Sequence, residues 1–165
     1  MDIIKLLQNE LEAEVATTRN MLQRVPADKW DWQPHPKSMN MKQLTVHIAE
    51  LPGWVTMALN TSELDFAAQP YQPTDVADNA ALLALFEGAV ASGRASLQNA
   101  KEEDLQPQWT LRHGEQILMQ TNKYGVIRHA LSQIIHHRAQ LGVYLRLLNI
   151  PIPGSYGPSA DEANF

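Results

Sequence analysis

The 165-residue sequence predicts an all-α protein, a four-helix bundle formed by a single domain of residues 1–165. Four segments carry apolar residues three or four positions apart, which is the spacing of an amphipathic helix. Prolines and polar residues separate these segments. A chain of this length buries one proper core and is short for two. Four helices of about 20–27 residues are typical of a bundle.

The first predicted helix runs from about Asp2 to Arg24, and Pro26 ends it. Its apolar positions are Ile4, Leu7, Leu11, Val15, Thr18, Leu22 and Val25. Residues 27–37, which are rich in tryptophan and proline, indicate an ordered and packed loop.

The second predicted helix begins near Ser38 or Asn40, and Asn40 with Gln43 has the spacing of a capping box. Pro52 removes a backbone donor and crowds the carbonyl of Ile48, so we expect a kink or a break there. The core-facing positions of this helix are Leu44, His47, Leu51, Trp54 and Ala58.

A long crossover over residues 60–74 is expected to connect the second helix to the third. The third helix opens at Asp75 or Asp78 and continues to about Lys101. Its apolar positions are Leu82, Phe86, Ala89, Val90, Gly93 and Leu97.

The helical pattern is interrupted between residues 105 and 120. This stretch predicts either a small hairpin that turns at His113 and Gly114 or a loop. The fourth helix is expected over residues 122–148. Prolines and glycines make the tail over residues 151–165 non-helical.

Composition excludes several classes of function. The formal net charge of −5 argues against a nucleic-acid partner bound through a broad basic face. The chain contains no cysteine, which rules out disulfides, zinc-thiolate sites and cysteine nucleophiles. The N-terminus lacks the pattern of a secretory leader, and no apolar run approaches about 18 residues. We therefore expect a cytoplasmic protein with no membrane partner.

Candidate metal ligands occur on two of the predicted helices. His137 shares its side of the fourth helix with apolar residues, and His47 has a similar place on the second helix. A core-facing histidine needs a partner for each ring nitrogen, and a metal ion is one such partner. Gln133 lies one turn before His137, about 6 Å along the helix. The three side chains offer nitrogen and oxygen donors to one metal ion and leave positions for substrate.

A polar cluster that satisfies its own hydrogen bonds is the alternative interpretation. Buried histidines are more often bonded to protein groups than to metals, and the neutral amide of Gln133 is a weak ligand. His129 and His136 project to the edge of the stripe, and either replaces Gln133 if the helix is rotated slightly. Glu50, one turn after His47, is a candidate base or orienting carboxylate, or simply a solvated helix residue.

The sequence resembles the DinB/YfiT-like superfamily over essentially its whole length. Three segments carry the resemblance: Thr45–Trp54 (TVHIAELPGW), His136–Arg146 (HHRAQLGVYLR) and Tyr156–Glu162 (YGPSADE). The resemblance implies a four-helix bundle, commonly a homodimer, with a divalent metal on one residue of the second helix and two of the last. Those positions fall on His47, Gln133 and His137. The family usually has histidine, or glutamate in some branches, where this chain has Gln133.

The resemblance also implies a thiol-dependent transferase or isomerase that uses a low-molecular-weight thiol such as bacillithiol or mycothiol. We expect a metal-dependent transferase or hydrolase acting on a small-molecule electrophile, with zinc or nickel bound, although iron also suits the donors. Glu50 is its candidate base, and Asp161 and Glu162 of the tail are candidate pocket residues. The alternative is a non-catalytic, stress-related bundle for dimerisation or small-ligand binding, which the amide at position 133 favours.

Overall fold

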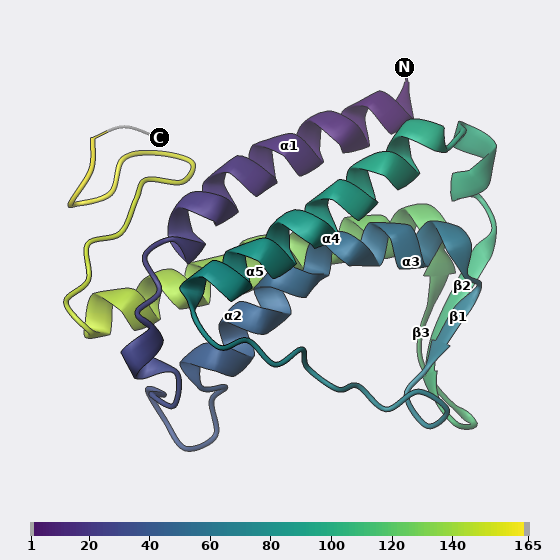
Figure 1. The fold of residues 1–165 in the computed structure, drawn as a ribbon. Helices are drawn as coiled ribbons and strands as arrows, with labels where there is room; N and C mark the ends of the chain where they lie inside the picture. Colours follow the sequence, from purple (N-terminus) through teal and green to yellow (C-terminus); the bar gives the residue numbers. More distant parts are fainter. Residues whose placement is uncertain (1, 164–165) are drawn as a thin grey trace.

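The computed structural model describes residues 2–163 and shows four long helical segments beside a small three-stranded sheet (Figure 1). The sheet means that the protein is mostly helical rather than all-α. The helices are α1 (Ile3–Leu22), α2 (Met41–Glu50), α3 (Trp54–Asn60), α4 (Asn79–Asn99) and α5 (Lys123–Leu147). Together α2 and α3 make up the second helical segment of the bundle.

Side-chain caps set the starts of the long helices. The carboxylate of Asp2 accepts a hydrogen bond from the Lys5 amide, and Asn40 and Gln43 form the predicted reciprocal capping box. Asp78 caps α4, so this helix begins at the later of the two predicted positions. Asn122 caps α5 in the same manner.

The second helical segment breaks at a 3₁₀ turn, Leu51–Gly53, as Pro52 predicts. Gly93 of α4 packs against this turn. A Cβ at that position would lie 2.7 Å from the carbonyl oxygen of Pro52, so only glycine fits without a shift. The break is therefore also the closest approach of α4 to the α2–α3 segment.

The sheet consists of β1 (Glu63–Asp65), β2 (Gln108–His113) and β3 (Gln116–Asn122) in that order. β2 and β3 form an antiparallel hairpin, the first of the two alternatives that the sequence left open for this stretch. Its turn lies at Gly114 and Glu115, one residue later than predicted, because Gly114 adopts a positive φ of 59°. β1, in the expected crossover loop, pairs in parallel with β2 and was not predicted.

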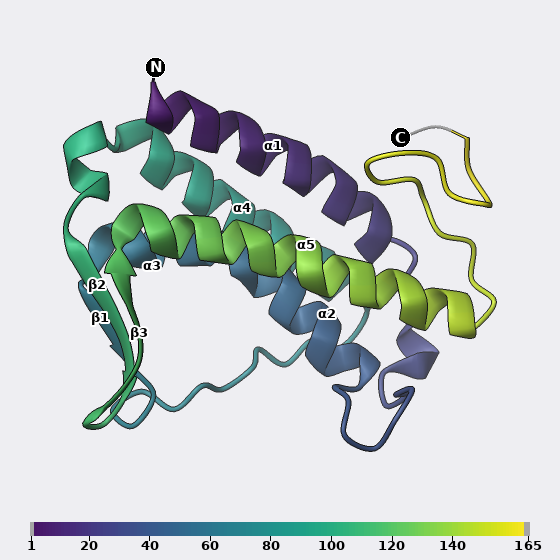
Figure 2. The same ribbon diagram turned by 180° about the vertical axis from the view of Figure 1, so that it is seen from behind.

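Two side chains of β2 hold the sheet together and fix it to the bundle. Arg112 of β2 pairs with Glu63 and Asp65 of β1, both at 2.8 Å. Trp109 is fully buried, and its ring N–H donates to Thr61 Oγ1 at 2.9 Å. In both views of the ribbon the sheet lies at one end of the bundle, and the loop from β1 to α4 runs back along α2 (Figures 1 and 2).

The core lies between the apolar faces of the helices. Among the helices that the structure describes, one, α4, has the length and apolar composition to cross a bilayer. Its apolar side packs inside the bundle, where Leu82, Phe86, Val90 and Leu97 are fully buried. Core helices pass the same test of length and composition, so it gives α4 no membrane role.

A buried polar cluster joins α1, α5 and the C-terminal tail. Arg138 is 2% exposed and Glu14 is 5% exposed, and they form an ion pair of 2.6 Å. Arg138 also donates to Thr18 Oγ1 at 3.0 Å. The hydroxyl of Tyr156 accepts from Arg138 at 2.9 Å and donates to Glu14 at 2.7 Å. The tail is thereby anchored beside the end of α1 (Figure 2).

The tail is non-helical, as predicted, over the residues that are described. Its acidic residues do not reach the histidines. Asp161 pairs with Arg146 at 2.6 Å, and Glu162 pairs with Arg24. Asp161 and Glu162, the candidate pocket residues of the tail, therefore lie away from the histidines, because these two arginines bind them. Residues 164–165 lie outside the described residues.

Candidate metal and ligand site

The structure brings His47 and His137 together. α2 packs against α5, and the ring centroids of the two histidines are 4.7 Å apart with planes at 80°. Both side chains are half-buried. Each histidine lies on the same face of its helix as buried apolar residues. Packing of these faces brings both rings to the boundary between α2 and α5. Two imidazoles from separate helices thus meet, and their role as metal ligands stays a prediction.

Both ring nitrogens of His137 face amide oxygens. Nδ1 is 2.8 Å from Oε1 of Gln140, and Nε2 is 2.7 Å from Oε1 of Gln133. A neutral imidazole carries one N–H and one lone pair. When Nδ1–H donates to Gln140, the lone pair of Nε2 faces the oxygen of Gln133. The lone pair of Nε2 and the oxygen Oε1 of Gln133 repel each other at 2.7 Å unless a proton or a metal ion lies between them. The alternative is that the Gln133 amide is turned so that its NH₂ group donates to Nε2.

This donor set fits a divalent metal. Metal–donor distances of about 2.0–2.2 Å place neighbouring donors about 3 Å or more apart. Gln133 and His137 therefore need to separate by only a few tenths of an ångström to share an ion. Within residues 2–163 no group of three His, Cys, Asp or Glu side chains is placed to hold a metal. The set is two imidazoles and one neutral amide, a weaker combination than three imidazoles.

The environment favours the neutral form of both imidazoles. Burial lowers the pKa of His47 below its usual 6.5, and a positive charge on His137 would lower it further. Burial likewise lowers the pKa of His137, and the adjacent His136 adds to the effect. Metals bind the neutral form of imidazole, so these shifts favour metal binding at pH 7.

We predict that, after chelation of metal, both histidines titrate below pH 6.5 in an NMR pH titration. Because their pKa is lower in the folded chain, the unfolded chain binds more protons once the pH falls below about 6.5. The free energy of unfolding should therefore decrease on acidification and level off below the folded-state pKa. His47→Gln should reduce this slope. A pKa of either histidine above 6.5 would contradict the prediction.

Glu50 holds the crossover against α2. Its carboxylate accepts from the Tyr71 hydroxyl at 2.6 Å, from the Thr74 hydroxyl at 2.6 Å and from the Thr74 amide at 3.0 Å. Burial and the bond to Glu50 raise the pKa of Tyr71, which keeps the phenol protonated. In the part of the chain that is described, no hydrogen bond joins Glu50 to His47. This geometry favours a structural role, and the role of Glu50 as a base stays a prediction.

A pocket of about 490 Å³ opens beside His47. Its walls come from α2, α3, the loop before α2 and the crossover: Met39, Gln43, His47, Trp54, Phe66, Tyr71 and Pro73. The crossover residues Phe66, Tyr71 and Pro73 were not predicted as pocket residues, because residues 60–74 were expected to be a plain connection. Two aromatic residues, Phe66 and Tyr71, in a proline-containing loop were the available signal.

His129 and His136 flank the pair of histidines. The ring of His129 lies 6.5 Å from that of Trp54, and its Nε2 is 3.5 Å from Gln133 Nε2. The ring of His136 is 4.8 Å from that of His137, but this side chain is exposed. Both are closer to the site than their edge positions on the helix indicate.

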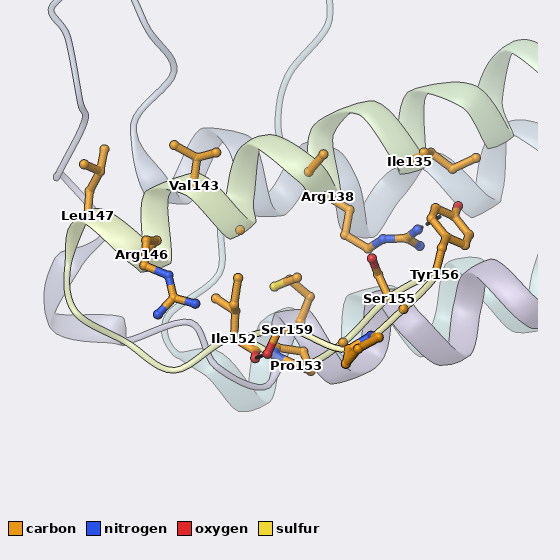
Figure 3. A pocket seen from close by; sticks show the side chains of 16 residues that line it. Ile135, Arg138, Val143, Arg146, Leu147, Ile152, Pro153, Ser155, Tyr156 and Ser159 are labelled. Carbon is orange, nitrogen blue, oxygen red and sulfur yellow. Dashed lines mark hydrogen bonds between the residues drawn. The ribbon is translucent and has the colours of Figure 1, made fainter. Parts of the chain in front are cut away.

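A second cavity, of about 500 Å³, lies between α5 and the tail (Figure 3). Its two cationic side chains are already paired, Arg138 with Glu14 and Arg146 with Asp161. Tyr156 and Arg138 point toward each other at one end of this cavity (Figure 3). The pocket beside His47 offers imidazole and amide groups instead, so we place the candidate site there.

The fold is similar to solved structures of DinB-like proteins. One from Bacillus subtilis has a TM-score of 0.69 at 17% identity, covering 89% of this chain and 96% of that chain. Another from Bacillus cereus has a TM-score of 0.68 at 14% identity, covering 91% and 95%. A mycothiol-dependent maleylpyruvate isomerase has a TM-score of 0.61 at 11% identity, covering 84% of this chain and 60% of that chain.

At these identities the structures establish the fold alone. No curated protein matches the sequence. The sequence does match the DinB family over residues 2–164, which is nearly the whole chain. The chain therefore belongs to the DinB family.

Proposed function

We propose that the protein binds a divalent metal ion through His47, Gln133 and His137 and uses a small thiol to act on a small electrophile. One observation carries this proposal: the ring centroids of His47 and His137 are 4.7 Å apart, and Oε1 of Gln133 lies 2.7 Å from Nε2 of His137. Of the three proposed ligands His47 lines the pocket, so a small molecule in the pocket would lie next to this imidazole. Similarity in fold to an isomerase named for its dependence on mycothiol supports a thiol as co-substrate.

A bound metal would act as a Lewis acid that lowers the pKa of a thiol, and zinc, nickel or iron suits these donors. The residues of the chain have separate tasks. Oε1 of Gln140 accepts a hydrogen bond from Nδ1–H of His137, which leaves the lone pair of Nε2 for the metal. His47 approaches from the opposite helix. Glu50 fixes the crossover, which together with Trp54 forms walls of the pocket.

We predict that Gln133→His raises the affinity for zinc at least about tenfold, because imidazole is a better ligand than a neutral amide. Gln133→Leu, which keeps the bulk and removes the donor, should lower it. Competition with a chromophoric chelator measures both affinities, and a thermal melt with and without zinc or nickel gives an independent readout. If the unmodified protein takes up neither metal and its melting temperature does not change, the metal site is refuted.

The alternative, a non-catalytic bundle for small-ligand binding, is favoured by the hydrogen bonds that the cluster makes within itself. Turnover distinguishes the two. Metal-loaded protein is mixed with a panel of small thiols and 1-chloro-2,4-dinitrobenzene, and loss of the free thiol is followed. Metal uptake without turnover would support the alternative.

A further inference from the structure

The pocket beside His47 has aromatic walls. Trp54 comes from α3, whereas Phe66 and Tyr71 come from the crossover. Aromatic rings pack well against flat apolar molecules, through stacked or edge-to-face contacts. The volume of about 490 Å³ lies within the range of about 300–1,000 Å³ that is typical of small-molecule sites. The shape and the walls thus suit a molecule of one or two rings.

Among the described residues, the side chains that line the pocket carry no fixed positive charge. In the described chain, no lysine or arginine side chain lines it. The cation closest in sequence to its walls, Lys42, pairs with Asp75 at 2.5 Å. The carboxylate of Glu50 lies directly behind Tyr71, whose hydroxyl it binds at 2.6 Å. In the metal-free protein a carboxylate ligand would lose water here, gain no ion pair with a lysine or arginine and lie near the negative charge of Glu50.

We propose that the protein side chains of this pocket, apart from any bound metal, select an uncharged aromatic small molecule over the carboxylate analogue of the same molecule. The inference rests on the proposed function, because it names the substrate class of that site. The selectivity comes from Trp54, Phe66 and Tyr71, which contact the ring, and from the missing cation. The crossover therefore determines specificity, while the histidines hold the metal.

Two probes that share one substituted ring, one with a neutral amide and one with a charged carboxylate, test the selectivity. 4-Chloro-3-nitrobenzamide and 4-chloro-3-nitrobenzoate share one ring and one size, and their affinities for the full-length protein are measured by calorimetry at pH 7.5. Each titration is done on the protein as purified and after chelation, because a carboxylate can ligate a metal directly. We expect the amide to bind at least about tenfold more tightly after chelation. Equal or tighter binding of the benzoate, or binding of neither probe, would overturn the proposal.

A matched pair of lysine variants tests the missing cation. Met39 lines the pocket and is 42% exposed, so Met39→Lys places an ammonium group at the wall without burying it. Leu118 of β3 is 48% exposed and lies outside the pocket lining, which makes Leu118→Lys the control. We expect at least about a tenfold gain in benzoate affinity for Met39→Lys alone. An equal gain in both variants, or a gain in neither, would overturn the proposal.

The two proposals fail separately. Metal titration reports on His47, Gln133 and His137, whereas probe selectivity after chelation reports on the pocket walls. A protein that binds zinc without preferring the amide refutes the inference alone. A protein that prefers the amide but binds no metal refutes the proposed function and leaves an aromatic binding site.

Discussion

Replacing Arg138 with methionine lowers the free energy of unfolding by about 3–5 kcal/mol, because it leaves the Glu14 carboxylate buried without its partner. Both side chains are at most 5% exposed. The substitution also removes the donors to Thr18 and Tyr156, so the tail loses one of its anchors. Urea denaturation followed by circular dichroism measures the change.

A surface ion pair of α1, the helix that carries Glu14, provides the control. Glu12 of α1 pairs with Arg94 of α4, and both side chains are more than 40% exposed. Arg94→Met should cost about 1 kcal/mol or less, since solvent screens the pair. The double variant Glu14→Leu with Arg138→Met should recover much of the lost stability, because the uncompensated charge is gone. Equal losses for the Arg138 and Arg94 variants would contradict this account.

His137→Ala should lower the affinity for zinc at least about 100-fold and abolish thiol-dependent turnover. Changes to groups that merely orient a ligand already cost about 10–100-fold, and His137 contacts the ion itself in our proposal. Gln140→Ala, which removes the acceptor for Nδ1–H, should fall within that smaller range. Metal competition and turnover are measured on the same preparations.

His136→Ala is the matched control, because this neighbouring imidazole is exposed and its removal should change zinc affinity far less than His137→Ala does. A thermal melt of each chelated variant shows whether it folds. Turnover that survives His137→Ala in a folded protein would refute the assignment of His137. Equal loss of affinity in the His136 and His137 variants would do the same.

The sequence predicts most helix limits because their signals are local. Asn40 with Gln43 caps α2, Asp78 caps α4, and Pro52 breaks the second segment where expected. β1 escapes prediction because three residues are too short to show a period. Its parallel partner β2 lies far along the chain, and such pairing leaves no local pattern.

In the candidate site too, the residues that follow a local pattern were predicted, and those that depend on contacts distant in sequence were not. The helical periodicity of the apolar residues places His47 and His137 on the core-facing sides of two helices, and their rings do meet. The crossover wall depends on Glu50 binding Tyr71, a contact between a helix and a loop that periodicity cannot reveal. Arg138 was also missed as a core residue. A signal existed, because a glutamate on the predicted core side of α1 requires a buried cation opposite it.

The contact between Gly93 and the Pro52 carbonyl has a consequence for the geometry of the pocket. α4 lies so close to the joint between α2 and α3 that a Cβ on Gly93 would overlap the Pro52 carbonyl, so a larger side chain at position 93 would have to push the joint away from α4. Because His47 lies before the joint and Trp54 after it, such a shift would change the separation of these two pocket residues. The crossover wall is held independently, by three hydrogen bonds to the carboxylate of Glu50.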